Sequence, residues 1–203
     1  MLDDWFRIAF EEARLATTDV IGRAKLHLAP DTLRRTLGQR TRARLKLLEI
    51  IVRRLIVLLA LSITLAPSNP RTKSAPAPLP EGVEDVTSSF PRVRRPALRL
   101  LWTTQYYSLN DPGFPEGLPR TTGPIPARPL MLKAHALMQV LKDPEAHARR
   151  VARVIARSRG KGEACPLIPP LAEARRLRRE LSIISDGLPM LIRQAWASCA
   201  DTS

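Results

Sequence analysis

The side chains best suited to acid–base chemistry or metal binding are three histidines, His27, His135 and His147. No two of them fall within one helical turn, and the sequence contains no HExxH pattern, so their spacing predicts neither a zinc site nor a metalloprotease. His147 follows two carboxylates at a predicted helix start, where acidic side chains are favoured by the helix dipole. We therefore expect no catalytic histidine and no metal.

Motifs that bind phosphate or activate a nucleophile are also missing. GxxxxGK[ST], GxGxxG and GxSxG do not occur, and Gly160-Lys-Gly162 is too short to cradle a phosphate and is typical of a helix end. Cys165 and Cys199 lack a CxxC spacing, so two unpaired thiols are expected. A disulfide between them would need an oxidising compartment. The sequence predicts a non-enzymatic protein with no cofactor and no small-molecule substrate.

Composition favours anionic partners. The 203-residue chain has 33 basic and 19 acidic residues, a net charge of +14, and its basic residues are 27 Arg and six Lys. A chain rich in Arg, Ala, Pro and Leu is typical of a GC-rich, bacterial genome. The charge suits phosphate backbones, acidic lipids or acidic proteins. We expect a cytoplasmic protein, either free or attached peripherally to the inner membrane.

The 19 prolines divide the chain by composition. We expect a mainly α protein with three parts: a long helical αα-hairpin over 1–66, a Pro-rich irregular linker over 67–128, and a basic cluster of short amphipathic helices over 129–203. Each helical part is small, so its core is marginal unless it packs on the other part or on a partner.

The hairpin is predicted from apolar periodicity and from caps. Asp3 or Asp4 is expected to cap the first helix, and Gly22 is expected to weaken it without ending it. The break is placed at Ala29-Pro30-Asp31, with Asp31 or Thr32 capping the second helix. The second helix continues to Pro67 and outruns the first, so its apolar end is expected to lack a cover within the hairpin.

The C-terminal part contains clear signals for where helices start and end. Pro129 opens a helix that runs to Leu141, and Asp143-Pro144 caps and starts the next one, which ends at Gly160 to Gly162. Pro169 or Pro170 is expected to open a further element. Asp186-Gly-Leu-Pro189 is expected to break it, with a short last helix over 190–200.

The apolar run at 47–66 is the main candidate for a contact surface. Reaching the 20 residues that a membrane span needs would include Glu49, Arg53 and Arg54, each costing about 2.5–3.5 kcal/mol at mid-bilayer. A full span is therefore not expected. Four ways of covering the apolar run are left: partial insertion into a membrane, burial in a helical core, a protein partner, or a second copy of the chain. The predicted contacts are Leu48, Val52, Leu55, Leu58, Leu59 and Trp102. Trp102 belongs to an aromatic island over 97–107, which is expected either to meet an interface or to pack back on the helices as part of the core.

Arginine-rich helix faces give the second candidate surface. Arg149, Arg150, Arg153 and Arg157 share one face of a predicted helix, within an arc of about 100°. The full set of predicted anion contacts is Arg40, Arg44, Arg53, Arg54, Arg149, Arg153, Arg157, Arg175 and Arg179. No zinc knuckle, aromatic RNA-binding string or helix-turn-helix signature accompanies them. We expect an uncharacterised interaction protein that meets a protein partner or the inner membrane surface through 47–66, with nucleic-acid binding through these arginines as the alternative.

Overall fold

A computed structural model describes residues 2–65, 97–101, 123–161 and 177–198. Helices dominate it, which confirms the predicted mainly α fold class. In chain order the elements are α1 (Leu2–Arg23), the 3-10 turn η1 (Leu26–Leu28), β1 (Thr32–Leu33), α2 (Arg35–Ser62), β2 (Ile125–Pro126), α3 (Arg128–Lys142), α4 (Pro144–Gly160) and α5 (Arg179–Ser198).

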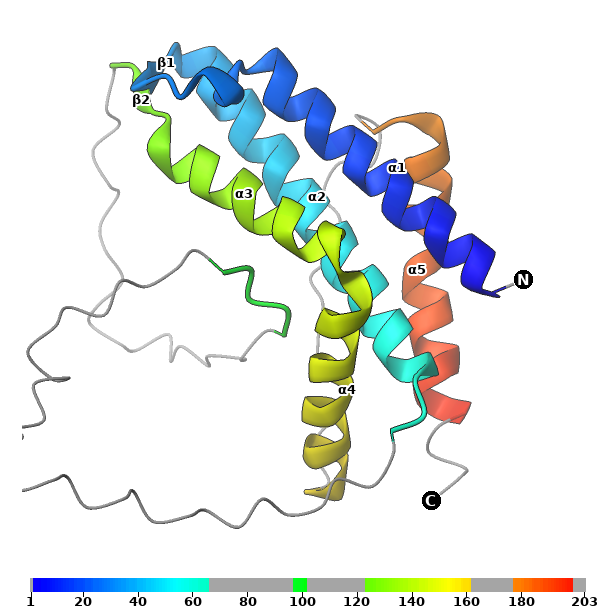
Figure 1. Ribbon diagram of the computed structural model, residues 1–203. Helices are drawn as coiled ribbons and strands as arrows, with labels where there is room; N and C mark the ends of the chain where they lie inside the picture. The colour runs from blue at the N-terminus through cyan, green and yellow to red at the C-terminus, as the bar shows by residue number, and fades with distance from the viewer. Residues whose placement is uncertain (1, 66–96, 102–122, 162–176, 199–203) are drawn as a thin grey trace, which may run out of the picture.

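Helix α2 lies at the centre of the fold. In Figure 1, α1 and α3 run along either side of it, and α4 and α5 run beside its C-terminal half. Every residue from Ile50 to Leu58 is buried, so this half of α2 has no solvent-facing stripe. A helix that is apolar almost all round is stable only when neighbours cover every side. The described helices of 1–66 and of 123–198 therefore share one core.

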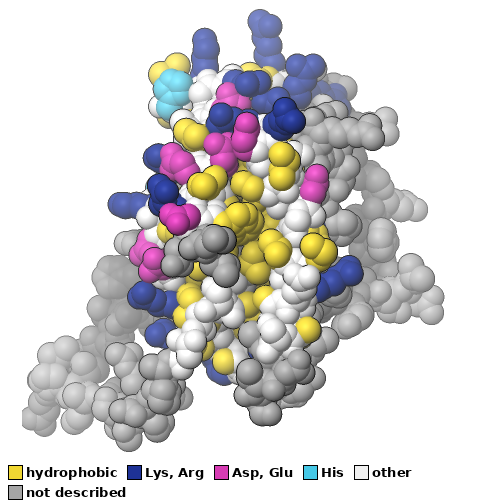
Figure 2. Space-filling view, turned by 90° about the vertical axis from the view of Figure 1, so that its right-hand side faces the viewer, with side chains coloured by type: hydrophobic (Ala, Val, Ile, Leu, Met, Phe, Trp, Pro, Cys, Tyr) yellow, Lys and Arg dark blue, Asp and Glu magenta, His cyan; other side chains and the backbone are white. Residues whose placement is uncertain are grey.

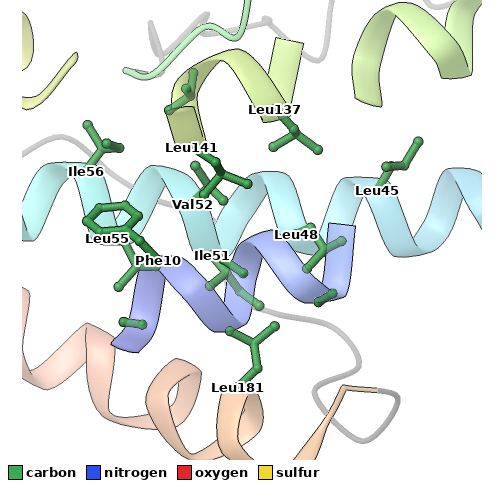
Figure 3. Close-up of a cluster of buried hydrophobic side chains, with 14 of the residues drawn as sticks. Phe10, Leu45, Leu48, Ile51, Val52, Leu55, Ile56, Leu137, Leu141 and Leu181 are labelled. Atoms are coloured by element: carbon green, nitrogen blue, oxygen red, sulfur yellow. The ribbon is translucent and has the colours of Figure 1, made fainter. Parts of the chain in front are cut away.

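The centre of that core joins four helices. Figure 3 shows Leu48, Ile51, Val52 and Leu55 of α2 among side chains of the surrounding helices. The neighbours labelled there are Phe10 of α1, Leu137 and Leu141 of α3 and Leu181 of α5. Burying one such aliphatic side chain contributes about 1.5–3 kcal/mol. The apolar end that the hairpin alone does not cover is thus covered by the chain's own C-terminal helices.

The chain reversal between α1 and α2 differs from the prediction. α1 ends at Arg23, directly after Gly22, and not at Ala29-Pro30-Asp31. Lys25 and Ala29 both adopt left-handed backbone conformations, with φ of 51° and 49°, and this ends the helix and closes η1. Glycine's low helix propensity, which was expected only to weaken α1, here coincides with its end.

A two-residue strand replaces the predicted cap of α2. Thr32 and Leu33 pair antiparallel with Pro126 and Ile125, and the Asp31 carbonyl accepts a hydrogen bond of 2.9 Å from the Ala127 amide. Neither Asp31 nor Thr32 caps α2, whose N-cap is Arg34 without a side-chain hydrogen bond. The end of the segment that was predicted to be an irregular linker thus forms a short ladder.

Glycine at position 38 lets this strand approach α2. A Cβ placed at Gly38 would lie 3.1 Å from both Cβ and Cδ1 of Ile125, which is tighter than most real contacts. The missing side chain therefore allows Ile125 to pack against the first turns of α2. At its other end α2 stops at Ser62 and Ile63 is extended, so the helix is shorter than the run to Ala66 that was predicted.

The two helices after the strand follow the prediction closely. α3 spans Arg128–Lys142, and α4 starts at Pro144 with Asp143 as its N-cap. The Asp143 carboxylate accepts a hydrogen bond of 3.1 Å from the Ala146 amide, which satisfies one of the free donors at a helix start. α4 ends at Gly160, as predicted.

Helix α5 contradicts the predicted break at 186–189. It runs through Pro189 without interruption. Proline inside a helix costs about 3 kcal/mol, because it removes one hydrogen bond and its ring crowds the preceding turn. Leu181, Leu188 and Ile192 are buried on both sides of that proline, at about 1.5–3 kcal/mol each. Their burial outweighs the cost and keeps α5 in one piece.

A buried cluster of charges fastens α2 to α3 and to residues 97–101. The Glu49 carboxylate forms ion pairs with both Arg53 and Lys133, and its own side chain is only 12% exposed. Arg53 also donates a hydrogen bond of 2.6 Å from Nε to the carbonyl of Arg99. Leu98 and Leu100 pack against the core nearby, so the described part of the predicted aromatic island lies on the helices, while Trp102 falls outside the described residues.

We predict that Glu49→Gln destabilises the protein by about 3–5 kcal/mol, because it leaves two cations in a largely buried site without their shared carboxylate. Urea unfolding followed by circular dichroism measures the change. Glu145→Gln is the matched control, since it removes an exposed pair with Arg149 and should cost less than about 1 kcal/mol. Equal costs for the two variants would contradict a structural role for the cluster.

Candidate anion-binding surface

The outer side of α4 is the strongest candidate site, and the fold explains why its arginines face outward. Ala148, Val151, Ala152 and Ile155 are buried, and α4 packs mainly on α2. The helical period then turns the opposite side toward solvent. The Asp143 cap sets where this helix starts.

Four exposed arginines make up this side: Arg149, Arg150, Arg153 and Arg157, called the α4 arginine face below. Arg149 contacts Glu145, with 3.2 Å between Nη2 and Oε2, and both side chains remain largely exposed. Arg157 donates from Nε to the backbone carbonyl of Arg153 at 3.2 Å. The face is therefore cationic, and its guanidinium groups remain accessible to an external anion. The sequence predicted three of its four members as anion contacts.

Arg159, two residues after Arg157, has a different role. Its guanidinium carbon lies 4.1 Å from the centre of the Trp196 ring, and Nη2 donates a hydrogen bond of 3.3 Å to the Trp196 carbonyl. A cation over an indole ring is stabilised by the ring's electrons. This contact ties the end of α4 to the end of α5, and the helical period places Arg159 on the side of α4 opposite the arginine face.

The other predicted anion contacts are scattered. Arg40 is exposed on α2, Arg44 is half-buried with Nη1 3.9 Å from the Asp19 carboxylate, and Arg179 is exposed at the start of α5. Arg175 lies outside the described residues. Arg40, Arg44 and Arg179 therefore lie on other helices than the α4 arginine face.

Arg53 and Arg54 require a correction. They were predicted to meet external anions, but both are buried, at 7% and 6% exposure. Burial lowers the pKa of each guanidinium below its ordinary value, and the Glu49 charge opposes this for Arg53. Arginine stays protonated even so. Sequence alone showed the Glu49–Arg53 spacing of one helical turn, but not that Lys133 would complete the cluster.

The predicted apolar contacts also lie inside the protein. Leu48, Val52, Leu55 and Leu58 are buried and Leu59 is half-buried, so in this structure they contact the chain's own helices. Of the possible covers for 47–66, the described residues show burial in a helical core. Among these residues, no helix combines the length and the apolar character that crossing a bilayer requires.

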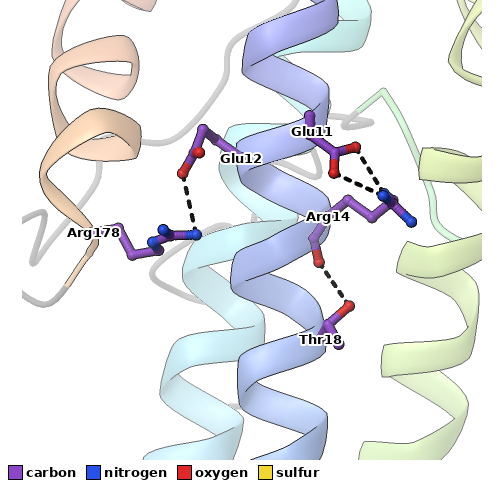
Figure 4. Close-up of polar contacts among 5 residues, drawn as sticks. All are labelled: Glu11, Glu12, Arg14, Thr18 and Arg178. Carbon is purple, nitrogen blue, oxygen red and sulfur yellow. Dashed lines mark hydrogen bonds and ion pairs between the residues drawn. The ribbon is translucent and has the colours of Figure 1, made fainter.

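A groove between α1 and α3 is the main alternative site. It has a volume of about 790 Å³, an apolar lining that includes Phe6 and Phe10, and charged residues such as Glu11 and Arg14 at its rim. Arg14 donates two hydrogen bonds to Glu11, at 2.9 Å and 2.7 Å, and the hydrogen bonding lowers the pKa of Glu11 (Figure 4). Glu11 is thus held as a carboxylate and is a poor proton donor at neutral pH.

The neighbouring carboxylate is also paired. Glu12 points away from that groove toward the start of α5, where its Oε2 lies 3.5 Å from Nη1 of Arg178 (Figure 4). Among the residues the structure describes, no group of three or more His, Cys, Asp or Glu is placed to hold a metal ion. Neither arrangement supplies a general acid beside a nucleophile.

His147 lies in the first turn of α4, beside the arginine face. Partial burial lowers the pKa of its imidazole, repulsion from Arg150 adds to this, and attraction to Asp143 opposes it. The neutral form is therefore favoured in the folded protein. This perturbation has a structural cause and does not require a catalytic role.

We predict that His147 makes the protein less stable in mild acid. Above the unfolded-state pKa of about 6.5 the ring is neutral in both states and has no effect. As the pH falls below that value the unfolded state binds the proton first, so the free energy of unfolding decreases. Urea unfolding between pH 7.5 and 5.5 should show a steeper loss for the wild type than for His147→Gln. Parallel pH profiles would contradict the assignment.

Comparison with known proteins adds no relative to this description. The chain matches no protein-family model, no curated protein and no solved structure.

Proposed function

We propose that this protein is a non-enzymatic, cytoplasmic helical interaction protein that binds the phosphate backbone of a nucleic acid through the α4 arginine face. The observation that carries the proposal is the orientation of α4. Its apolar side is used by the core, while four arginines on the opposite side face solvent. Helix α4 therefore presents positive charge and little apolar surface to a partner.

This orientation favours a polyanion over a lipid bilayer. A helix that lies in a membrane interface inserts an apolar face and keeps its basic residues at the headgroups. The apolar residues of α4 are committed to the core, and Val154, at 36% exposure, is the main exception. Charge alone contributes about 1 kcal/mol per arginine at an anionic membrane, so four give a Kd of roughly 1 mM.

Phosphate backbones suit the same residues better. Arg149, Arg153 and Arg157 follow one another at intervals of four residues, so their side chains start about 5–6 Å apart along one line. Guanidinium groups bind phosphate oxygens through two parallel hydrogen bonds. Contacts of this kind give sequence-independent binding that weakens steeply with salt. No described residue supplies an obvious base-reading element, so we propose backbone binding only.

We predict that replacing Arg149, Arg153 and Arg157 together by Gln weakens binding to duplex DNA and flattens its salt dependence. Each lost phosphate contact should reduce the slope of log K against log salt by about 0.9. Fluorescence anisotropy across a salt series measures both. The control replaces Arg7, Arg23 and Lys25 by Gln, which removes the same charge from exposed positions elsewhere.

The control separates a surface effect from a net-charge effect. If both triple variants lose the same affinity, only the overall charge matters and the α4 arginine face is not the site. No DNA or RNA binding even at low salt would contradict the proposal outright. Binding to anionic lipid vesicles tighter than to DNA would point instead to the membrane alternative.

A further inference from the structure

The outer side of α5 carries apolar residues that the fold does not use. Ile183 and Met190 are 66% and 61% exposed, among the most exposed large hydrophobic side chains of the described residues. They lie on the side of α5 opposite its buried residues Leu181, Leu188 and Ile192. Figure 2 views the side of the molecule where α1 and α5 lie, and hydrophobic side chains gather in the middle of it.

The exposed residues form a regular line along the helix. Ile183, Gly187, Met190 and Gln194, called the outer seam below, are spaced by four, three and four residues. This is the spacing with which one helix packs along another in a coiled coil. The predicted break at 186–189 had divided this line between two elements. It becomes visible only because α5 continues through Pro189.

Glycine at the middle of the seam makes no close approach to another of the described residues. Gly187 lies inside a helix, where glycine is less stable than alanine, and a Cβ there would meet nothing within 4 Å. The position therefore leaves a gap between Ile183 and Met190 that a side chain from another helix can fill.

The charges beside the seam identify the occupant. Asp186 and Arg193 are exposed, one helical heptad apart, on the same flank of the seam. In the described part of the chain neither of them forms an ion pair. When two copies of α5 pack antiparallel about a two-fold axis, Gly187 lies opposite the partner's Met190, and Ile183 lies opposite the partner's Gln194. The same symmetry brings Asp186 near the partner's Arg193, and it does so twice.

The exposed apolar residues of α1 lack this complementarity. Ile8 and Leu15 are 54% and 40% exposed, but the carboxylates around them are already paired within the chain. These pairs are Asp4–Arg7, Glu11–Arg14, Glu12–Arg178 and Asp19–Arg23.

We propose that the protein self-associates into a symmetric dimer through the outer seam, with two copies of α5 packed antiparallel. The partner is a second copy of this chain, and the contact is a short helix pair with two Asp186–Arg193 ion pairs at its edges. This surface is separate from the α4 arginine face, so the dimer and nucleic-acid binding stand or fall independently.

Sedimentation velocity over a concentration series tests the dimer, up to about 1 mM because an interface this small associates weakly. Met190→Gln should raise the dimer Kd about tenfold or more. Leu28→Gln is the control, since Leu28 is 66% exposed and lies on η1, away from α5. A monomer at every concentration, or equal effects of the two substitutions, would overturn the proposal. Circular dichroism checks that each variant is folded.

A charge exchange tests the antiparallel arrangement. Asp186→Arg and Arg193→Asp should each weaken self-association, because each places like charges opposite one another in the symmetric pair. An equimolar mixture of the two variants should recover dimers, since each of their contacts then joins opposite charges. If the mixture stays as monomeric as its components, or if the single variants dimerise like the wild type, the two-fold antiparallel pairing is wrong.

Discussion

The fold depends on the burial of the C-terminal half of α2. From Ile50 to Leu58 this helix is buried on every side, and no single neighbour could achieve that. Helix α1 covers one side, and α3, α4 and α5 cover the rest. Because those three helices come from beyond residue 122, the hairpin and the C-terminal helices depend on one another for stability. A core of the size that each part could form alone would be marginal.

That central burial also divides the arginines into two kinds. Arg53 and Arg54 share the most apolar stretch of α2 and are carried into the interior with it. The interior tolerates Arg53 because Glu49 and the Arg99 carbonyl lie within reach. On α4 the reverse happens, because burial of Ala148, Val151, Ala152 and Ile155 leaves the arginines on the free side. The basic composition alone does not distinguish these two roles.

Features that depend only on residues a few positions apart could be predicted from the sequence. The Asp143-Pro144 start and the Gly160 end of α4 need only a cap, a fixed φ and a helix stop, all within a few residues. The orientation of the α4 arginine face followed from the 3.6-residue period.

The remaining features depend on residues far apart in the sequence. α5 crosses Pro189 because its apolar side is buried against the bundle, and Ile125 packs at Gly38 through a strand pairing that joins residues more than 90 apart. The sequence showed that 47–66 needs a cover but could not say which one, because that depends on how α3, α4 and α5 pack. The outer seam was missed for a related reason, since its spacing is regular only when α5 is read as one helix.

Native-state hydrogen exchange of the α2 amides tests the central claim most directly. If the apolar half of α2 is the centre of the core, amides from Ile51 to Leu58 exchange only through global unfolding. Their opening free energies should then equal the free energy of unfolding measured by denaturant. Opening of this stretch at a much lower free energy than that of the whole protein would show that it is not buried as described.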